Sequence, residues 1–334
     1  MRDHGGHGTQ PMQDIETARP PAEVTVIIVS FNTRDLTLRA LETLLAETRH
    51  TRMRIVVIDN GSKDGSDTAI AEAFPDVELI RSGENLGFAK ANNVVAAEAE
   101  TEWLLLLNPD TEILDGAVDT LMEFARKNPG HGIYGGRTVF ADRTLNPGSC
   151  WMRITPWSIF CSATGLTAKF RNKEFFNPEG IGGWARDTER EVDVVQGSFF
   201  LIRRDLWNRL GGFDPRYFMY GEEADLCLRA KALGASPIMT PTAEIVHLGG
   251  AASATRGDKQ VMVFQARTAL IRDHWPRWQV PFGLACQWLN AGLRHLGFQM
   301  LASLKGARYR DRADAAGTVW KSRRDWLSGF SGSR

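Results

Sequence analysis

Short apolar runs alternate with stretches of helical character over the first third of the chain. The runs contain few polar residues and end at turn-forming residues, which is typical of parallel strands buried on both faces. Strands are predicted at residues 24–30, 54–59, 77–80 and 103–107. Helices are predicted between them, at residues 36–45, 67–74 and 88–100. This order predicts an α/β fold with a Rossmann-like, mostly parallel sheet flanked by helices over residues 22–130.

The pattern changes in the second half of the chain. Residues 135–190 contain many Gly, Pro and Trp residues and show little periodicity. A strand is predicted at residues 192–202, followed by a helix that begins near Arg204 and ends at Gly211-Gly212. Another helix is predicted to begin near Tyr220, and its first residues are acidic, as the positive end of a helix dipole favours.

The C-terminal part contains an amphipathic segment at residues 282–304, with Gln287, Asn290 and Arg294 opposite its apolar face. The following residues, 305–334, carry eight Lys or Arg and three Asp. Two interpretations are open at this point. In the first interpretation, the helix and its basic tail bind an anionic membrane surface. In the second, the helix packs on the rest of the protein.

Composition narrows the class of protein. The chain has 334 residues, 43% of them hydrophobic, and a formal net charge of zero, so no overall basic field indicates nucleic-acid binding. Its four Cys residues lie far apart, which argues against a zinc site or a disulfide framework and suits a reducing compartment. Residues 1–22 are polar and are expected to form a disordered tail rather than a signal peptide. No run of about 18 apolar residues predicts a membrane-spanning helix.

Polar clusters directly follow the predicted strands or open the helices between them. The clusters are residues 30–32, 59–66, 85–93 and 108–110. Each alone is an ordinary turn or helix cap. The carboxyl ends of parallel strands, however, share one rim of the sheet, where α/β folds bind ligands. Carboxylates and backbone N–H groups on such a rim can hold a ribose, a base and a metal-bound diphosphate, and Asp110 is the best placed carboxylate.

Motifs of several other α/β classes do not occur in the sequence. No G-x-G-x-x-G follows the first predicted strand, which disfavours a dinucleotide-dependent oxidoreductase. No G-x-x-x-x-G-K-[ST] or G-x-S-x-G occurs, which argues against P-loop NTPases and α/β-hydrolases. A nucleotidyltransferase normally has a Gly-rich loop with a basic residue after its first strand, and residues 30–34 do not supply one.

Five segments together resemble the family 2 glycosyltransferases of the GT-A fold, and within them the bacterial rhamnosyltransferase-like branch. The segments are VTVIIVSFN, VVIDNGSKDGS, NLGFAKANN, LLLLNPD and GGFDPRYFMYGEEADLCLRA. The resemblance covers about residues 22–275. It implies a nucleotide-sugar-binding half at residues 23–130 and an acceptor-binding, catalytic half of the same domain at residues 131–275. Residues 276–334 would then form an amphipathic, basic helical extension.

The resemblance also implies roles around the nucleotide sugar. The residues implied in its binding are Ser30, Asn32, Asp59, Asn85, Gly87, Lys90, Asn93, Asn108 and Asp110. Many relatives carry Arg where this chain has Asn92, and Lys90 would supply the missing charge. Asn108-Pro-Asp110 matches the D-x-D metal motif with Asn in place of its first Asp. Asp110 is therefore the main protein carboxylate expected on a divalent cation, Mg²⁺ or Mn²⁺, and the nucleotide phosphates complete the site.

The catalytic base is implied to lie in residues 222–225. This segment matches the family's E-D-x-D segment, with Glu223 at the position of the usual Asp base, Glu222 as the alternative and Asp225 beside them. The preceding aromatic residues, 217–220, would form an apolar wall that raises a carboxylate pKa towards the range of a general base. Without the resemblance, the same acids read as the solvated start of a helix.

Further residues are candidates for metal and acceptor contacts. His247 follows a short apolar run and is expected to complete the metal site, where it would favour Mn²⁺ over Mg²⁺. A lone His in such a place is otherwise a core residue. Arg267 and His274 are candidates for phosphate contacts. The candidates for stacking on an acceptor sugar, which are otherwise packing residues, are Trp151, Trp157 and Trp184.

The implied reaction is transfer of a sugar, with inversion, from a nucleoside diphosphate to a hydroxyl group. The expected donor is dTDP-L-rhamnose, with UDP-galactofuranose or another UDP-hexose as alternatives. The expected acceptor is a cell-surface glycan or a polyprenyl-linked glycan. A catalytically inactive nucleotide-sugar-binding scaffold is the alternative from another class, because two motifs are altered. A cytoplasmic protein, peripheral at the inner face of the cell membrane, is expected.

Overall fold

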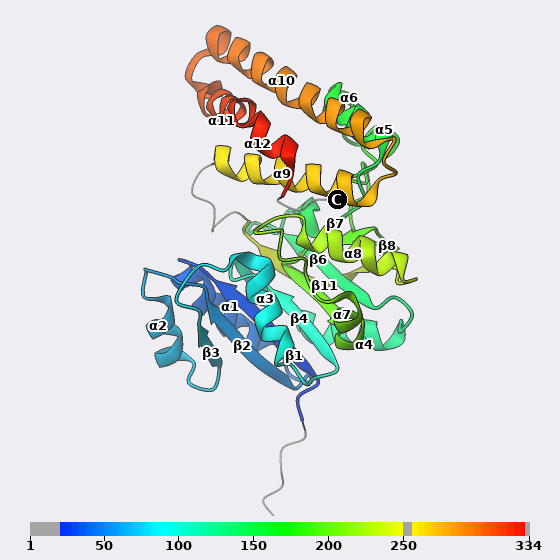
Figure 1. Ribbon diagram of the computed structural model, residues 1–334. Helices are drawn as coiled ribbons and strands as arrows, with labels where there is room; N and C mark the ends of the chain where they lie inside the picture. Colours follow the sequence, from blue (N-terminus) through cyan, green and yellow to red (C-terminus); the bar gives the residue numbers. More distant parts are fainter. Residues whose placement is uncertain (1–20, 250–255, 331–334) are drawn as a thin grey trace, which may run out of the picture.

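The computed structural model describes residues 21–249 and 256–330 (Figure 1). Nearly all of the tail predicted at residues 1–22 therefore lies outside the described residues. The strands are β1 (Val24–Ser30), β2 (Met53–Asp59), β3 (Glu78–Arg81), β4 (Trp103–Leu107), β5 (Thr111–Ile113), β6 (Ile133–Val139), β7 (Cys150–Trp151), β8 (Arg190–Glu191), β9 (Val194–Val195), β10 (Phe199–Arg203) and β11 (Ile238–His247).

A mixed sheet forms the centre of the molecule. Its strands follow the order β3-β2-β1-β4-β10-β6-β11-β5, and β8 pairs with β11. β3, β2, β1 and β4 are parallel, and β6 and β11 run in the same direction. β10, β5 and β8 run antiparallel to their neighbours. A separate two-stranded sheet pairs β7 with β9. The sheet is thus mostly parallel, and strands from both halves of the chain share it.

Helices cover both faces of the sheet. The helices are α1 (Arg34–Glu47), α2 (Ser66–Ala73), α3 (Gly87–Ala97), α4 (Ala117–Lys127), α5 (Pro156–Ala163), α6 (Leu166–Lys169), α7 (Arg204–Leu210), α8 (Glu222–Ala232), α9 (Arg256–His274), α10 (Val280–Lys305), α11 (Arg310–Lys321) and α12 (Arg323–Ser328), with 3₁₀ turns η1 (Pro147–Ser149) and η2 (Gly306–Tyr309). α1, α2 and α4 pack on one face, and α3, α7 and α8 on the other.

The apolar sequence of β1 explains its central position. Val26 and Ile28 point into the core under α1 and α4, whereas Ile27 and Val29 point into the core under α3 and α8. A strand that is apolar on both faces is stable only between two helical layers, where burial of each such side chain contributes about 1.5–3 kcal/mol. β4 is buried along its whole length for the same reason.

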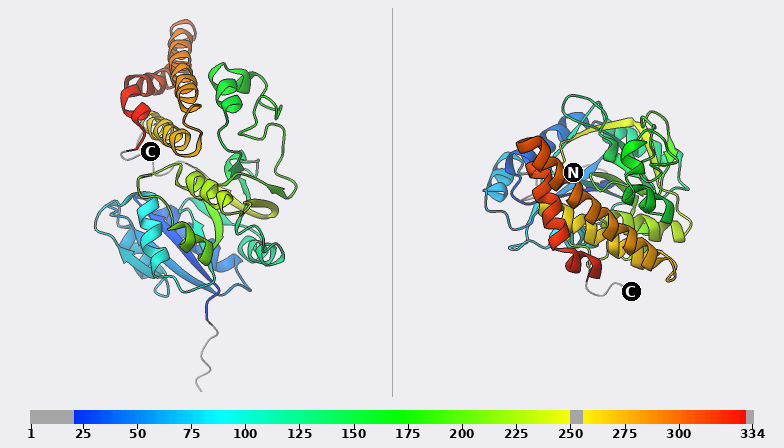
Figure 2. Two further views of the ribbon diagram at one scale, coloured as in Figure 1. Left: turned by 45° about the vertical axis from the view of Figure 1, so that its right-hand side comes forward. Right: turned by 90° about the horizontal axis from the view of Figure 1, so that it is seen from above.

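The C-terminal helices form a layer beyond one end of the sheet, coloured yellow to red in Figure 1. α9 packs against α11 and α12 around Val319 and Trp326, so this layer begins before residue 276. α10 and the α5–α6 region rise next to each other (Figure 2), where Asn290 Nδ2 donates a hydrogen bond of 2.7 Å to the carbonyl oxygen of Ser162. In the described part of the chain, no helix is long and apolar enough to cross a membrane.

The structure differs from the predicted elements mainly after residue 130. β6 was not predicted, because Gly135 and Gly136 interrupt its apolar pattern. A Cβ on Gly136 would lie 2.2 Å from the carbonyl oxygen of Ala243, so the close approach of β6 and β11 requires glycine. α9 was not predicted either, since it is packed from more than one side and shows no single apolar stripe. The strand predicted at 192–202 is two strands, β9 and β10.

Candidate active site

A cavity of about 410 Å³ lies at the carboxyl ends of β1, β2, β4 and β11. It occupies the rim of the sheet at which the polar clusters of the sequence were expected to meet. Its polar lining includes Asn60, Asn85, Asn108, Asp110, Gln196, Tyr220, Glu222, Glu223, His247 and Lys259. This first cavity is called the rim cavity below.

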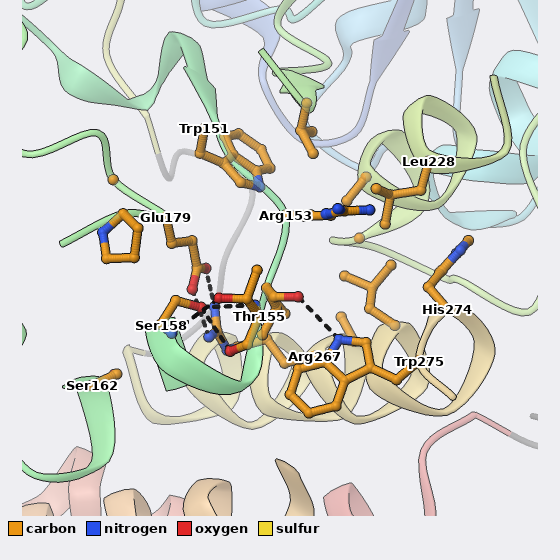
Figure 3. A pocket seen from close by; sticks show the side chains of 18 of the residues that line it. Trp151, Arg153, Thr155, Ser158, Ser162, Glu179, Leu228, Arg267, His274 and Trp275 are labelled. Atoms are coloured by element: carbon orange, nitrogen blue, oxygen red, sulfur yellow. Dashed lines mark hydrogen bonds and ion pairs between the residues drawn. The ribbon is translucent and has the colours of Figure 1, made fainter. Parts of the chain in front are cut away.

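A larger cavity, of about 1100 Å³, lies between α5, α8 and α9. Figure 3 shows Trp151 pointing into it and Glu179 paired with Arg267 at one side. Trp275 Nε1 closes part of its wall by donating a hydrogen bond of 3.0 Å to the carbonyl oxygen of Ile154. We call it the helical cavity. The two cavities share four lining residues: Gln196, Tyr220, Glu223 and Lys259.

Asp110 and His247 face each other in the rim cavity. Asp110 Oδ1 lies 3.4 Å from His247 Nε2, and both side chains are buried. Asn108 Nδ2 lies 3.5 Å from the same ring nitrogen. The antiparallel pairing of β5 with β11 sets this arrangement, because it places His247 opposite Thr111. Asp110 Oδ2 accepts a hydrogen bond of 3.0 Å from the N–H of Gly249.

The chemistry of this donor set fits a divalent cation. Burial alone would raise the pKa of Asp110, but the hydrogen bond and charge of His247 outweigh it, so the pKa is lowered and the carboxylate is ionised at neutral pH. His247 Nδ1 is buried with no hydrogen-bond partner among the described residues. Across residues 21–249 and 256–330, no three His, Cys, Asp or Glu side chains gather into a metal site. Asp110 and His247 could therefore hold an ion only together with other ligands, such as substrate oxygens.

Glu222 and Glu223 begin α8 at the point where the cavities meet. Tyr220 and Gly221 precede them with φ of 70° and 90°, a left-handed turn that starts the helix abruptly. Burial raises the pKa of Glu223 to about 7. Burial and the charge of Glu223 raise the pKa of Glu222 well above its usual value. Oε2 of each carboxyl has no hydrogen-bond partner among the described residues. Glu223 lines both cavities and so can contact two ligands at once.

The turn before α3 forms another side of the rim cavity. Asn60 holds this turn, since its Nδ2 donates to Asn85 Oδ1 at 3.1 Å and its Oδ1 accepts from the N–H of Leu86 at 2.9 Å. Gly87 has φ of 78°, and a Cβ there would lie 2.6 Å from the carbonyl oxygen of Phe218. Only glycine therefore lets the turn approach the segment that leads to Glu223.

The loops after β1 and β2 are joined beside the rim cavity. Asn32 Oδ1 accepts a hydrogen bond of 2.8 Å from the N–H of Lys63, and its own N–H donates to Ser62 Oγ at 3.0 Å. Asp59 is buried, and its Oδ2 accepts from the N–H of Ser62 at 3.2 Å. Asp59 Oδ1 has no partner within the described chain. Of the nine residues expected to bind the nucleotide sugar, Asn85, Asn108 and Asp110 line the rim cavity directly.

The other six of the nine are absent from the described lining of both cavities: Ser30, Asn32, Asp59, Gly87, Lys90 and Asn93. Of these, Ser30 and Asn93 have hydrogen bonds to other protein groups. Ser30 is buried in a hydroxyl cluster with Thr33 and Thr37, at 3.2 and 3.0 Å. The side-chain amide of Asn93 makes two hydrogen bonds to the backbone of Phe213: Nδ2 donates to the carbonyl oxygen at 2.8 Å, and Oδ1 accepts from the N–H at 2.9 Å. Lys90 is exposed on α3. The side chains of Ser30, Lys90 and Asn93 therefore do not belong to the described lining of the rim cavity, and their role towards a nucleotide sugar stays a prediction.

The three candidate tryptophans have different surroundings. Trp151 lines the helical cavity. Trp157 stacks on Phe160 and donates from Nε1 to the carbonyl oxygen of Phe175, in an exposed aromatic cluster. The guanidinium groups of Arg186 and Arg190 both lie over the Trp184 ring, and Trp184 Nε1 donates a hydrogen bond of 3.1 Å to Thr188 Oγ1. Only Trp151 of the three contributes to the described cavity walls.

Asp225 and Arg267 are held in ion pairs, and His274 is in hydrogen-bonding contact with Asp225. Asp225 is buried between Arg229, at 2.7 Å, and His274 Nε2, at 2.9 Å. It therefore ties α8 to the end of α9. Arg267 pairs with both carboxylate oxygens of Glu179 in the wall of the helical cavity. His274 also lines that cavity.

Two residues at the junction of the cavities escaped sequence reasoning. Lys259 lies in the first turn of α9, with Nζ 5.5 Å from the ring centre of Tyr220. Gln196 lies between β9 and β10 and accepts a hydrogen bond of 2.9 Å from Ser198. Neither belongs to a recognisable motif, and α9 itself was not predicted, so the sequence carried no signal for them.

α10 packs in an unexpected orientation. Its polar side faces the protein, where Gln287 Nε2 donates to the carbonyl oxygen of Phe264 at 2.8 Å and to Thr268 at 2.7 Å. Its apolar side is exposed, and Leu296 and Leu304 are 66% and 73% accessible. The exposed apolar residues of α10 are Phe282, Trp288, Leu289, Leu293, Leu296, Met300 and Leu304. The helix thus packs on the protein, but not through the face that the sequence marked as apolar.

Comparisons with known proteins identify the family and the fold of the chain. Residues 25–210 match the family model for glycosyl transferase family 2. The chain belongs to this family. The structure of the mannosyltransferase PcManGT from Pyrobaculum calidifontis, solved with GDP-Man and Mn²⁺, is similar with a TM-score of 0.53 and 19% identity, over 93% of this chain and 84% of that one. This likeness shows the fold, which is GT-A, as the sequence resemblance implied.

Sequence relatives include two rhamnosyltransferases. The N-acetylglucosaminyl-diphospho-decaprenol L-rhamnosyltransferase of Mycobacterium tuberculosis is 30% identical over 204 residues, which are 58% of this chain and 66% of that protein. The rhamnosyltransferase WbbL of Escherichia coli is 29% identical over 233 residues, 67% of this chain and 83% of that protein. The match therefore spans slightly less than two thirds of the mycobacterial relative.

Proposed function

We propose that the protein is an inverting rhamnosyltransferase that moves L-rhamnose from dTDP-L-rhamnose to a hydroxyl group of a lipid-linked glycan at a membrane surface. The observation that carries this proposal is that the rim cavity and the helical cavity meet at Glu223. One cavity is suited to a nucleotide sugar and the other to an acceptor, with a general base between them. The names of the two rhamnosyltransferase relatives support the choice of sugar.

The rim cavity is the proposed donor site. Asp110 and His247, with Asn108 beside them, would hold a divalent cation, and the Mn²⁺ bound by the structural neighbour supports that assignment. A bound divalent cation neutralises the charge that develops on a departing diphosphate. The amide groups of Asn60 and Asn85 offer further polar contacts on the opposite side.

Glu223 is the proposed base. As the acceptor hydroxyl oxygen forms its bond to the anomeric carbon, the bond from that carbon to the diphosphate oxygen breaks, and the nucleoside diphosphate leaves with the electron pair. The hydroxyl proton passes to the Glu223 carboxylate. A pKa near 7 suits this transfer, because the base is partly ionised at neutral pH and still basic enough to accept the proton. The pKa of Glu222 beside it is also raised, by burial and by the charge of Glu223, so Glu222 holds its proton more tightly than an exposed glutamate does.

The exposed apolar face of α10 is the proposed contact with an anionic lipid bilayer. Four exposed basic residues follow this face in the chain: Lys305, Arg308, Arg310 and Arg312. Apolar residues that enter the acyl region and adjacent cations that meet anionic headgroups are the two terms that bind such helices to membranes. The α5–α6 wall of the helical cavity packs beside α10, which would bring the acceptor site close to the bilayer.

A donor screen with product detection by mass spectrometry tests the transfer reaction. The full chain is incubated with dTDP-L-rhamnose, UDP-galactofuranose and other UDP-hexoses, each with Mn²⁺ or EDTA, and a lipid-linked N-acetylglucosaminyl diphosphate. We expect a rhamnosylated product that depends on the metal. Transfer from a UDP-hexose alone would replace the donor assignment. Binding of nucleotide sugars without any transfer or hydrolysis would identify a non-catalytic binder and refute the proposal.

Vesicle sedimentation tests the membrane contact separately. Replacing Leu293, Leu296 and Leu304 by Ser removes exposed side chains and should not disturb the core. Because burying each Leu contributes about 1.5–3 kcal/mol, binding to phosphatidylglycerol vesicles should fall by at least about 100-fold. Leu233→Ser, at another exposed leucine, is the control. Equal sedimentation of the triple variant and the unaltered protein would eliminate α10 as the contact.

A further inference from the structure

The helical cavity carries two cations on one wall. Lys231 Nζ lies 2.5 Å from Asp193 Oδ1, and Arg153 Nε lies 3.9 Å from Asp193 Oδ2. Asp193 is buried, whereas 63% of the Arg153 side chain is exposed. One carboxylate thus faces two cations, and a surplus positive charge remains at the cavity wall. Arg153 is held there by its backbone, because its N–H donates to Asp193 Oδ2 at 2.9 Å.

α8 connects this cationic wall to the proposed base. Glu223 lies at one end of its cavity-facing side and Lys231 eight residues further along, a distance of about 12 Å at 1.5 Å per residue. Ala224 and Leu228 lie between them and line the same cavity. Figure 3 shows Arg153 beside Leu228, with Trp151 across the cavity. The wall therefore presents a carboxylate, an apolar strip and a cation pair in that order.

We infer that Arg153 and Lys231 bind the diphosphate of the acceptor, while the acceptor sugar lies over Ala224 and Leu228 with its reactive hydroxyl at Glu223. The spacing suits a glycosyl diphosphate, since one sugar ring and a diphosphate together bridge the length of this wall. Arg and Lys are the side chains that recognise phosphate, and the apolar strip and Trp151 suit the apolar face of a sugar ring. This inference rests on the proposed function, because it uses Glu223 as the base.

Two acceptors that differ only in the diphosphate test the inference. One is farnesyl N-acetylglucosaminyl diphosphate, and the other is farnesyl N-acetylglucosaminide. With dTDP-L-rhamnose, the unaltered protein should have a kcat/KM at least about 10-fold higher for the diphosphate acceptor, as expected for one or more charge-assisted hydrogen bonds. Arg153→Gln and Lys231→Gln should each lower that value about 10-fold or more, and leave the neutral acceptor and the donor KM unchanged. Lys127→Gln, at an exposed lysine on α4, is the control.

Asp193→Asn provides a variant with the opposite expected sign. It removes the negative charge that faces both cations but keeps an oxygen to accept the N–H of Arg153, so the KM for the diphosphate acceptor should fall. If Arg153→Gln and Lys231→Gln affect both acceptors equally, or neither, the inference is wrong although the transfer reaction stands. If the unaltered protein transfers to neither acceptor, the proposed function fails, and the inference fails with it.

Discussion

Replacing Glu223 by Gln should abolish transfer and also make the protein harder to unfold at neutral and alkaline pH. The two effects have one cause, the burial of a carboxylate that must be ionised to work. The pKa of Glu223 is raised from its usual 4.5 to about 7. The folded protein therefore holds this proton more tightly than the unfolded chain. The contribution of Glu223 to the free energy of unfolding is therefore largest below pH 4.5 and falls as the pH rises to about 7, above which it is lost.

The size of the effect follows from the same pKa. Raising it from 4.5 to about 7 corresponds to about 3 kcal/mol of destabilisation above pH 7. Gln keeps the shape without the charge and should recover most of that amount. Glu222 contributes in the same direction, because loss of the neighbouring charge lowers its raised pKa. For a chain of 334 residues the unfolding entropy is about 0.7 kcal/mol/K, so the midpoint should rise by roughly 4–5 °C at pH 8.

Thermal unfolding measured between pH 5 and pH 8.5, together with transfer rates, provides the assay. Glu223→Gln should melt higher than the unaltered protein at pH 8 and about equally at pH 5. Glu72→Gln, at an exposed glutamate on α2, should change neither the midpoint nor the rate. The transfer rate of the unaltered protein should rise with pH through about 7 as Glu223 ionises. An unchanged or lower midpoint at pH 8 would show that this carboxylate is not desolvated, and full activity would show that it is not the base.

Two further substitutions test the donor side and the turn beside it. Asp110→Asn should reduce transfer about 100-fold or more and raise the Mn²⁺ concentration needed for half-maximal rate. Asp76→Asn, at an exposed loop residue, is the control and should leave both quantities unchanged. If Asp110→Asn does not alter the metal dependence, Asp110 is not a metal ligand. Gly87→Ala should lower the free energy of unfolding in urea by about 2–4 kcal/mol, because it combines left-handed backbone strain with a contact of 2.6 Å to the carbonyl oxygen of Phe218. Gly83→Ala introduces the same strain without a close contact and should cost about 1 kcal/mol. Equal losses for the two Gly variants would contradict the close approach at Phe218.

The first half of the fold was predictable because its strands are apolar on both faces. β1 and β4 have no polar residue in their centres, and such strands occur almost only in parallel sheets covered by helices. The second half was not predictable in this way. β6 contains adjacent glycines that are required by the nearby backbone of β11, and no local pattern records that requirement. α9 is stabilised by contacts with several elements, so its apolar residues follow no single period.

The candidate site was predictable where short motifs carry it. Asp110, His247 and Glu223 were expected from the family resemblance, and they line one continuous region of the described chain. Ser30 and Asn93 were expected in the site for the same reason, but their hydrogen bonds go to neighbouring protein groups. A motif indicates that residues share a region of the fold, whereas the direction of each side chain depends on tertiary contacts. Lys259 shows the converse, a residue at the junction that no motif marks.

The position of β10 limits how this protein can be recombined with its relatives. β10 comes from the second half of the sequence, yet it lies between β4 and β6 and is hydrogen-bonded to both. A fragment that ends near residue 130 would leave the long apolar edge of β4 unpaired and prone to aggregation. Hybrids with a relative should therefore keep residues 23–247 from one parent and be joined in the connection between α9 and α10, where no sheet strand is divided. Such a hybrid exchanges the exposed apolar face of α10 and leaves the walls of both cavities almost unchanged.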